Sequence, residues 1–326
     1  MAGHGRFARV RIVFAGTPEP AVPSLEALVA AGHDVVGVVT RPDAPSGRGK
    51  KLTASPVARR AEEMGLEVVK PVHPRDEDFV GWLTAKAPEA CPVVAYGALV
   101  PDHVLAIPTH GWINLHFSLL PAWRGAAPVQ RSIMAGETLT GATTFRLVRE
   151  LDAGPVHASV TEPIAATDTA ADLLGRLAVS GAELLVDTLA GIEAGQEPVE
   201  QPAEGVTLAP KITVDEARID WTRSATEVSA LVRGTHPSPG AWTLLEGQRF
   251  KVALAVPAPD AVPIPDAGPL APGELRATRR QLLAGTGEGA VELLRVQAFG
   301  KKEMAGPDWA RGMHQLPARF DEKESA

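Results

Sequence analysis

The chain has 326 residues, of which 45% are hydrophobic and 22% charged, and its formal net charge is −7. This length predicts two domains, because single hydrophobic cores rarely grow past about 250–300 residues. No apolar run approaches the roughly 20 residues of a membrane span, and the lone Cys91 excludes an intrachain disulfide and a cysteine-based zinc site. The basic start lacks a signal-peptide cleavage site, so a cytoplasmic protein without membrane contact is expected.

The first part of the chain alternates apolar strands with amphipathic helices. Val22, Leu25 and Leu28, for example, recur at helical spacing, and Gly32 follows as a stop signal. The expected strands are Arg9–Gly16, Asp34–Thr40, Leu66–Val69, Cys91–Ala95 and Trp112–Leu115, and the expected helices include Pro18–Ala31 and Pro56–Met64. This alternation indicates an α/β fold with a parallel sheet covered on both sides. Ligands of such sheets bind beyond the carboxyl ends of the strands.

After Asp152 the strand–helix pattern continues up to a segment of different composition. A strand is expected at Gly154–Val160 and a long helix at Thr169–Ala194, followed by a segment rich in Gly, Pro, Gln and Glu. Short strands bounded by Gly and Pro then predict a small all-β domain with one helix. Its expected elements are the helix Ala225–Arg233 and the strands Gly240–Leu245, Phe250–Leu254, Gln281–Ala284 and Ala290–Ala298. The predicted organisation is a domain at 1–195, a linker at 196–210 and a second domain at 211–320.

Asn114 and His116 lie two residues apart at the end of an apolar strand, so their side chains are expected on one face. Asp152 follows in Leu151-Asp-Ala-Gly-Pro155. An amide, an imidazole and a carboxylate together can polarise a carbonyl, hold an oxyanion and move a proton at neutral pH. Each residue alone also fits a structural role, as a core histidine, a turn former or a cap. Their conjunction at a strand end favours a catalytic set.

Other familiar sites are absent from the sequence. Gly16-Thr-Pro lacks the later glycines of a dinucleotide fingerprint, and Ser46–Lys51 lacks the spacing of a P-loop. No His-x-His or HExxH pair predicts a metal site, and no Gly-x-Ser-x-Gly elbow makes Ser118 a hydrolase nucleophile. The segment 46–51 therefore remains a basic loop that can hold phosphates by charge and exposed backbone N–H groups.

The motifs closely resemble those of the formyltransferases that use 10-formyltetrahydrofolate. The resemblance rests on Asn114-x-His116, the Ser118-Leu-Leu-Pro121 turn and Leu151-Asp-x-Gly154. The branch that acts on methionyl-tRNA is matched by Val13-Phe-Ala-Gly-Thr-Pro18, Thr40-Arg-Pro-Asp43 with Gly47-Arg-Gly-Lys-Lys51, Ala209-Pro-Lys-Ile212, Ile219-Asp-Trp221, Pro237-Ser-Pro-Gly-Ala241, Leu293-Leu-Arg-Val-Gln297 and Gly300-Lys-Lys302. The resemblance covers residues 9 to 316, although the Pro-rich loop 258–269 is longer than the family needs.

The resemblance implies a Rossmann-like domain followed by a smaller OB-like β-barrel. It implies transfer of the formyl group of 10-formyltetrahydrofolate to the amino group of initiator methionyl-tRNA, by a monomer and without a metal. Asn114 and His116 would hold the developing oxyanion, and Asp152 would orient His116 and accept the amine proton. Folate would be bound by Ser118, Leu119, Leu120 and Pro121, with Tyr96 and Gly97 lining the pterin pocket.

The tRNA contacts implied by the resemblance are Arg48, Lys50 and Lys51, in the basic loop. Other basic clusters lie at Arg276 with Arg279-Arg280 and at Lys301-Lys302, and each cluster alone also fits a solvated surface. Three alternatives remain: a formyltetrahydrofolate hydrolase domain, a sugar-nucleotide formyltransferase, and an RNA-binding module without catalysis. The first two share the catalytic set but need neither the basic loop nor this second domain, and the third predicts a damaged set.

Overall fold

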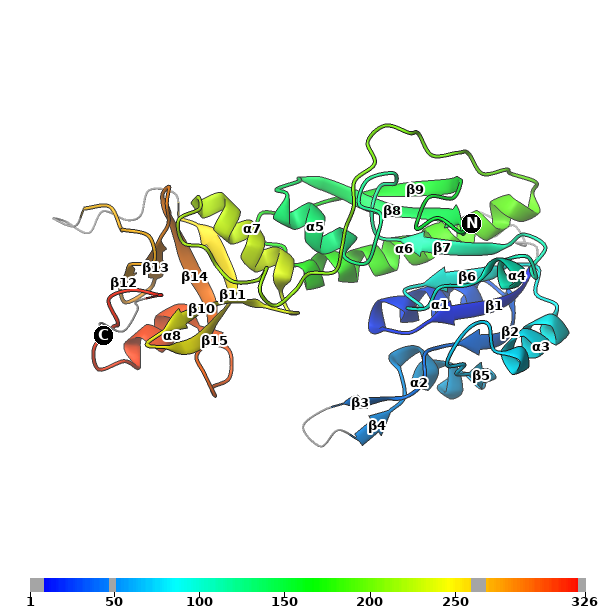
Figure 1. Cartoon of the computed structure of the whole chain (residues 1–326), viewed down its shortest axis with the longest axis horizontal. Helices are drawn as coiled ribbons and strands as arrows, with labels where there is room; N and C mark the ends of the chain where they lie inside the picture. Colours follow the sequence, from blue (N-terminus) through cyan, green and yellow to red (C-terminus); the bar gives the residue numbers. More distant parts are fainter. Residues whose placement is uncertain (1–8, 47–50, 259–267, 322–326) are drawn as a thin grey trace, which may run out of the picture. The chain divides into compact units, whose positions relative to one another are not determined.

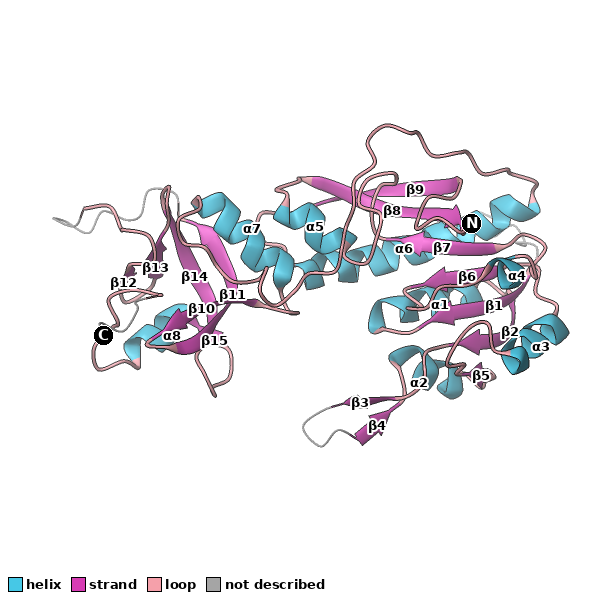
Figure 2. Cartoon of the chain, in the orientation of Figure 1, coloured by secondary structure: helices cyan, strands magenta, loops and turns pink. Residues whose placement is uncertain are grey.

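The computed structural model describes residues 9–46, 51–258 and 268–321, and its chain forms two compact units (Figure 1). The first unit comprises Met1–Gly125, Gly141–Glu162 and Leu174–Leu208, and the second comprises Ala126–Thr140, Pro163–Leu173 and Ala209–Ala326. Helices and strands alternate in the first unit, whereas strands dominate the second, as Figure 2 shows.

The first unit is built on a seven-stranded sheet with the order β5-β2-β1-β6-β7-β8-β9. Its strands are β1 (Arg11–Gly16), β2 (Asp34–Val39), β5 (Val68–Val69), β6 (Cys91–Val94), β7 (Trp112–His116), β8 (Leu139–Arg146) and β9 (Val156–Pro163). The first five in this spatial order run parallel, and β8 runs antiparallel to β7. The predicted α/β fold is confirmed, and β8 makes the sheet mixed.

Helices cover this sheet. They are α1 (Val22–Ala30) with a 3-10 turn η1 (Glu19–Ala21) before it, α2 (Pro56–Glu63), α3 (Glu77–Lys86), α4 (Asp102–Leu105) and α6 (Ala170–Glu193). The start of α2 agrees with its sequence, since Pro56 takes the first position and the Ser55 hydroxyl accepts a hydrogen bond from the Ala58 amide at 3.0 Å. One face of the sheet packs on α3 and α4, with Trp112 of β7 in the same buried cluster.

Strand β8 is not among the predicted elements, because its segment is rich in threonine and contains Gly141. Six of its eight residues are nevertheless buried. The threonine hydroxyls find partners: Thr143 Oγ1 donates to the Ser118 carbonyl at 2.7 Å, and Thr144 Oγ1 lies 2.7 Å from Thr188 Oγ1. A Cβ at Gly141 would lie 2.0 Å from the Val160 carbonyl oxygen, so glycine allows the close approach of β9. The buried positions of β8 are thus filled largely by hydrogen-bonded threonines, and the strand lacks the apolar pattern by which a buried strand is recognised in a sequence.

The second unit contains an antiparallel sheet with the order β10-β11-β14-β13-β12, and β15 pairs with β14. Its elements are α5 (Pro128–Met134), α7 (Ala225–Thr235), β10 (Ala241–Leu245), β11 (Gln248–Pro257), β12 (Leu275–Ala277), β13 (Leu282–Gly285), β14 (Ala290–Gln297), β15 (Met304–Ala305) and α8 (Gly306–Arg311). A capping box of Ser224 and Glu227 starts α7. The predicted small all-β domain is confirmed, and its predicted helix is α7, while α5 and α8 are further short helices of this unit.

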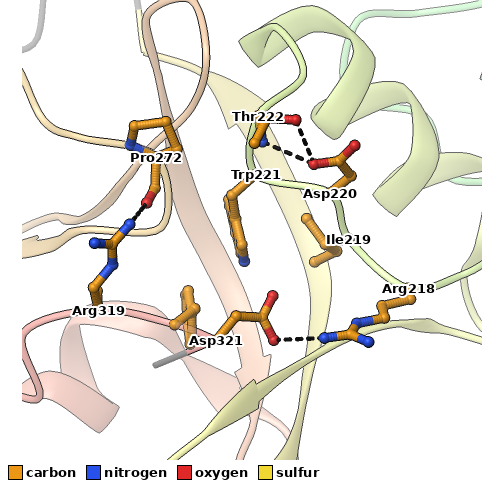
Figure 3. Close-up of a pocket in the computed structure, with 9 residues that line it drawn as sticks. Arg218, Ile219, Asp220, Trp221, Thr222, Pro272, Arg319 and Asp321 are labelled. Carbon is orange, nitrogen blue, oxygen red and sulfur yellow. Dashed lines mark hydrogen bonds and ion pairs between the residues drawn. The ribbon is translucent and has the colours of Figure 1, made fainter. Parts of the chain in front are cut away.

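The segment 318–321 joins the two ends of this sheet. The Ala318 carbonyl accepts from Leu275 at the start of β12, and the Asp321 amide donates to Leu244 of β10, both at 2.8 Å. Between them Phe320, which is 1% exposed, stacks on Trp221 with ring centroids 5.0 Å apart. Figure 3 shows residues that line a surface pocket beside this contact, among them Trp221 and the ion pair of Arg218 and Asp321. The closed circuit agrees with the expected OB-like barrel.

His33, which lies between α1 and β2, makes the stability of the fold depend on pH. It is 6% exposed, and its Nδ1 accepts a hydrogen bond from the Val10 amide at 3.4 Å. Burial lowers the pKa of His33. A group whose pKa is lowered in the folded state stabilises the fold above its unfolded pKa of about 6.5, and that contribution is lost as the pH falls.

We therefore expect a His33→Asn variant to lose less unfolding free energy than the parent chain between pH 7.5 and pH 5.5. Asparagine keeps an acceptor for Val10 but cannot take up a proton. Urea denaturation at both pH values measures the effect. His73, which is exposed, is the matched control site, where the same substitution should leave the pH dependence unchanged. If the unfolding free energy of His33→Asn and of the parent chain fell equally between these pH values, His33 would not be the source of the pH dependence.

Candidate active site

Strand β7 carries Asn114 and His116 at its carboxyl end, on the face that Trp112 also occupies, because side chains alternate along a strand. The indole of Trp112 donates to the Val104 carbonyl at 2.9 Å and fixes the start of the strand. His116 is 6% exposed and meets the ring of Phe145 edge-on, with centroids 6.4 Å apart. The two predicted residues therefore lie where the sequence places them, at the carboxyl edge of the parallel strands.

The imidazole of His116 lies between two acceptors. Its Nε2 is 2.9 Å from the Trp123 carbonyl oxygen, and its Nδ1 is 3.8 Å from Oδ2 of Asp152. Because a carbonyl only accepts, Nε2 carries a proton in this arrangement. The separation of Nδ1 from the carboxylate oxygen is longer than a hydrogen bond, and the two groups attract each other as opposite charges only when the imidazole is protonated. The structure thus brings together an imidazole and a carboxylate that lie far apart in sequence.

Asp152 is held in a defined conformation. Its Oδ2 accepts a hydrogen bond from the Gly125 amide at 2.8 Å, and its φ of 49° lies in the left-handed region that aspartate tolerates better than most residues. Two residues later, a Cβ at Gly154 would lie 1.8 Å from the Arg146 carbonyl oxygen, so no other residue fits without movement of the backbone. The Asp-x-Gly pattern therefore has a local physical reason.

The turn after β7 is internally braced. The Ser118 side chain is fully buried, and its hydroxyl donates to the Ala122 carbonyl at 2.6 Å. Thr143 Oγ1 accepts from the Leu120 amide at 3.2 Å, and the Leu120–Pro121 peptide is cis. The side chain of Leu119 packs against Gly141 of β8. In this turn Ser118 acts as a structural group, while Leu119, Leu120 and Pro121 are partly exposed.

Tyr96 and Gly97 lie at the same edge of the sheet, after β6. The Tyr96 carbonyl accepts from Thr17 Oγ1 at 2.8 Å, and Thr17 Oγ1 accepts in turn from the Arg41 amide at 3.3 Å. These bonds link the loops that follow β1, β2 and β6. Burial raises the pKa of the Tyr96 hydroxyl, and the nearby Arg41 guanidinium opposes this shift. Gly97 is exposed with a φ of 83°, which favours glycine there.

The basic loop follows β2. Arg48 and Lys50 lie outside the described residues. Lys51 is exposed and begins β4 (Lys51–Thr53), which pairs with β3 (Ala44–Ser46) in a short antiparallel hairpin. This hairpin is not among the predicted elements, since Ala-Pro-Ser and Lys-Leu-Thr carry no strong strand pattern. The position of the hairpin after a parallel strand places it at the carboxyl edge of the sheet.

Several residues around His116 and Asp152 carry no motif signal. Trp123 donates its amide to Thr207 Oγ1 at 2.8 Å, and the Arg124 amide donates to the Thr207 carbonyl at 2.9 Å. Gln201 contacts both Arg124 and the Asp152 backbone. Sequence reasoning assigned residues 196–210 to a linker because of their composition, and neither Gln201 nor Thr207 stands in a recognisable pattern.

The described part of the chain contains no group of three or more His, Cys, Asp or Glu residues placed to hold a metal ion. In the same residues, no helix is both long enough and apolar enough to cross a membrane.

Comparison with known proteins agrees with the fold and the motifs. The formyl transferase family model matches residues 8–189, and the model of the formyl transferase C-terminal domain matches residues 211–314. A methionyl-tRNA formyltransferase of Streptomyces coelicolor is 60% identical over 305 residues, which are 93% of this chain and 96% of that protein. One of Thermobifida fusca is 57% identical over 304 residues, again 93% of this chain and 96% of that protein.

Solved structures of lower identity share the fold. An N-formyltransferase from Helicobacter canadensis, solved with folinic acid and dTDP-3-aminofucose, is 16% identical with a TM-score of 0.65, covering 87% of this chain and 98% of that one. HypX from Aquifex aeolicus, solved with tetrahydrofolic acid, is 19% identical with a TM-score of 0.64, covering 93% of this chain and 47% of that one. Identity over nearly the full length of the curated relatives decides the family: the chain belongs to the formyl transferases and, within them, to the methionyl-tRNA formyltransferases.

Proposed function

We propose that this enzyme transfers the formyl group of 10-formyltetrahydrofolate to the α-amino group of initiator methionyl-tRNA, giving N-formylmethionyl-tRNA for translation initiation. Family membership makes the chain a formyl-transferring enzyme that uses a folate-derived donor. The observation that carries the chemical proposal is the buried His116 imidazole 3.8 Å from Asp152 at the carboxyl edge of the sheet. We place this reaction in the cytoplasm and assign it to a monomer, with residues 1–195 as the catalytic domain and 211–320 as a tRNA-binding domain.

His116 and Asn114 are assigned to the formyl oxygen. The donor supplies an electrophilic formyl carbon, whose oxygen becomes negatively charged when the amine attacks. Nε2 of His116 donates its proton to the Trp123 carbonyl, and Nδ1 is not hydrogen-bonded to Asp152. In the protonated imidazole the Nδ1 proton is therefore the one that can be donated to the oxygen. The amide of Asn114, two residues earlier on the same strand face, supplies the second hydrogen bond. Donors fixed before the reaction stabilise such charge without reorganisation.

Asp152 is assigned two roles. Its carboxylate orients His116 and attracts the charge of a protonated imidazole, and it accepts the proton that the attacking amine loses. The hydrogen bond from the Gly125 amide and the left-handed turn hold this carboxylate in place. When the tetrahedral species breaks down, His116 delivers a proton to the departing N10 of the folate. In this step the protonated imidazole loses its Nδ1 proton. The proton that Asp152 accepted from the amine then passes to Nδ1, 3.8 Å away, so both groups return to their starting states.

The folate site is assigned to the turn Ser118–Pro121 and to Tyr96 and Gly97. The buried Ser118 hydroxyl is engaged within the turn, so the backbone and the partly exposed Leu119, Leu120 and Pro121 side chains are the groups that contact the ligand. Gly97 leaves space for a flat ring to approach the backbone, because it has no side chain.

The test is formyl transfer to charged initiator methionine tRNA, compared with charged elongator methionine tRNA and with an amino sugar nucleotide. We expect product from 10-formyltetrahydrofolate and none from 5-formyltetrahydrofolate, with the initiator tRNA as the preferred acceptor. Formylation of the amino sugar nucleotide alone would establish the sugar-nucleotide alternative. Release of formate without formylated tRNA would establish the hydrolase alternative.

The basic loop provides a separate prediction. We assign Arg48, Lys50 and Lys51 to phosphates of the tRNA acceptor end, so Arg48→Ala should raise the KM for methionyl-tRNA and leave the KM for the folate donor unchanged. Loss of one phosphate contact should also reduce the slope of log affinity against log salt by about 1. The control is Arg9→Ala, because exposed Arg9 pairs with Asp34 near the amino end of β1, at the opposite edge of the sheet. An unchanged KM for charged tRNA at low salt removes the loop from tRNA binding.

A further inference from the structure

Residues 199–207 run back along the catalytic sheet. Val199 pairs with Val156 of β9 through two backbone hydrogen bonds of 2.7 and 2.8 Å. Thr207 binds the amides of Trp123 and Arg124, next to the carbonyl that holds His116. Between these two anchors lies Gln201, whose side chain is partly buried. The segment is therefore fixed to the first unit on both sides of Gln201.

The side chain of Gln201 uses both ends of its amide. Its Nε2 donates to the Asp152 carbonyl at 2.9 Å and to the Gly154 carbonyl at 2.8 Å. Its Oε1 accepts from Arg124, at 3.2 Å from Nε and 2.6 Å from Nη2. The orientation of the amide is unambiguous, because a flip would set Nε2 against the donor-only guanidinium and Oε1 against two carbonyl oxygens.

These four hydrogen bonds tie together the two segments that define the site. Arg124 directly precedes Gly125, whose amide holds the Asp152 carboxylate, and it directly follows Trp123, whose carbonyl holds His116. The Asp152 and Gly154 carbonyls belong to the left-handed turn that presents the carboxylate. Gln201 thus connects the segment of Trp123 and Arg124, which holds the His116 imidazole, to the turn at Asp152 that presents the carboxylate.

We propose that Gln201, oriented by Arg124, is a positioning residue that sets the separation of the Asp152 carboxylate from the His116 imidazole. Gln201 touches neither group directly, so its effect on the reaction passes through the Asp152 turn. The proposal rests on the catalytic roles assigned above to His116 and Asp152.

The test is Gln201→Glu, which has the same shape and still accepts from Arg124 but places an oxygen against two carbonyl oxygens. We expect kcat to fall by about 10- to 100-fold, the scale for an error of about 1 Å in a catalytic group. The KM values for methionyl-tRNA and for the folate donor should stay nearly constant, because Gln201 is assigned to neither substrate. In an Asp152→Asn background the same change should add less than about a 3-fold loss, since residues that act through one another are not additive.

The matched control is Gln196→Glu, which puts the same charge on an exposed glutamine shortly before the segment and should leave kcat unchanged. If Gln201→Glu lowers the melting temperature strongly, Arg124→Lys is the second test variant. Lysine keeps the charge but loses the bidentate contact with Oε1 of Gln201, so the same loss of kcat is expected. The proposal is overturned if a folded Gln201→Glu variant has a kcat near that of the parent chain. It is also overturned if the loss of kcat in the variant carrying both Gln201→Glu and Asp152→Asn equals the product of the two single losses. Retained activity in Asp152→Asn alone would instead contradict the catalytic role of Asp152.

Discussion

Replacing His116 by alanine is expected to lower kcat for formyl transfer by about 10²- to 10³-fold, the loss that follows removal of one oxyanion donor. Asn114→Ala should give a loss of similar size, because its amide is assigned to the same oxygen. Both substitutions should leave tRNA affinity nearly unchanged, since neither side chain is assigned to the tRNA. Single-turnover measurements with saturating donor and acceptor separate this loss from effects on binding.

The control for His116→Ala is the melting temperature, because the imidazole also packs edge-on against Phe145. His116→Asn keeps a hydrogen-bonding side chain at this position and should be the more stable variant, yet it cannot carry the positive charge that Asp152 attracts. Turnover near that of the parent chain in His116→Ala or in Asn114→Ala would remove that residue from the mechanism.

Asp152→Asn is expected to lower kcat by about 10²- to 10⁴-fold, the range for losing a general base. Asparagine suits the left-handed backbone and can accept from the Gly125 amide, so the turn should persist while the negative charge is lost. Asp152→Ala removes the hydrogen bond as well and places alanine at a positive φ, so it should also lower the free energy of unfolding. Kinetics from pH 6 to 9, combined with denaturation curves, distinguish the two variants. Full activity of Asp152→Asn throughout this range would exclude both proposed roles.

Local pattern was enough to predict the parallel strands of the sheet in the first unit. Continuous apolar runs ending at Gly16, Thr40 and Ala95 marked buried parallel strands, and the structure has strands there with bounds shifted by a few residues. The spacing of Asn114 and His116 also determined that both lie on one face of β7. In these cases the pattern of apolar residues along a few neighbouring positions shows which side chains are buried, so the strand can be predicted without the tertiary structure.

The supports of the site could not be predicted in this way. Gln201 binds a turn 49 residues earlier in the chain, and Thr207 contacts Trp123 across 84 residues. Neither contact leaves a periodic trace, because each is a single polar side chain in a stretch of loop. Strand β8 escaped detection for a related reason: its buried hydroxyls are satisfied by partners such as Thr188, which only the folded chain supplies. Long-range polar contacts are thus the part of the site that needs coordinates.

The ring pair of Trp221 and Phe320 has a consequence for the order of events during synthesis. Trp221 precedes β10 in the chain and Phe320 follows β15, yet their rings stack, and Phe250 also packs on Phe320 with ring centroids 5.3 Å apart. Strands β10 to β14 therefore emerge from the ribosome before the residue that seals their core exists. Because domains generally fold as units while the chain grows, the nascent barrel exposes the faces of Trp221 and Phe250 until its last aromatic side chain arrives. Chaperones that bind exposed apolar surface are therefore expected to bind the nascent chain during this interval.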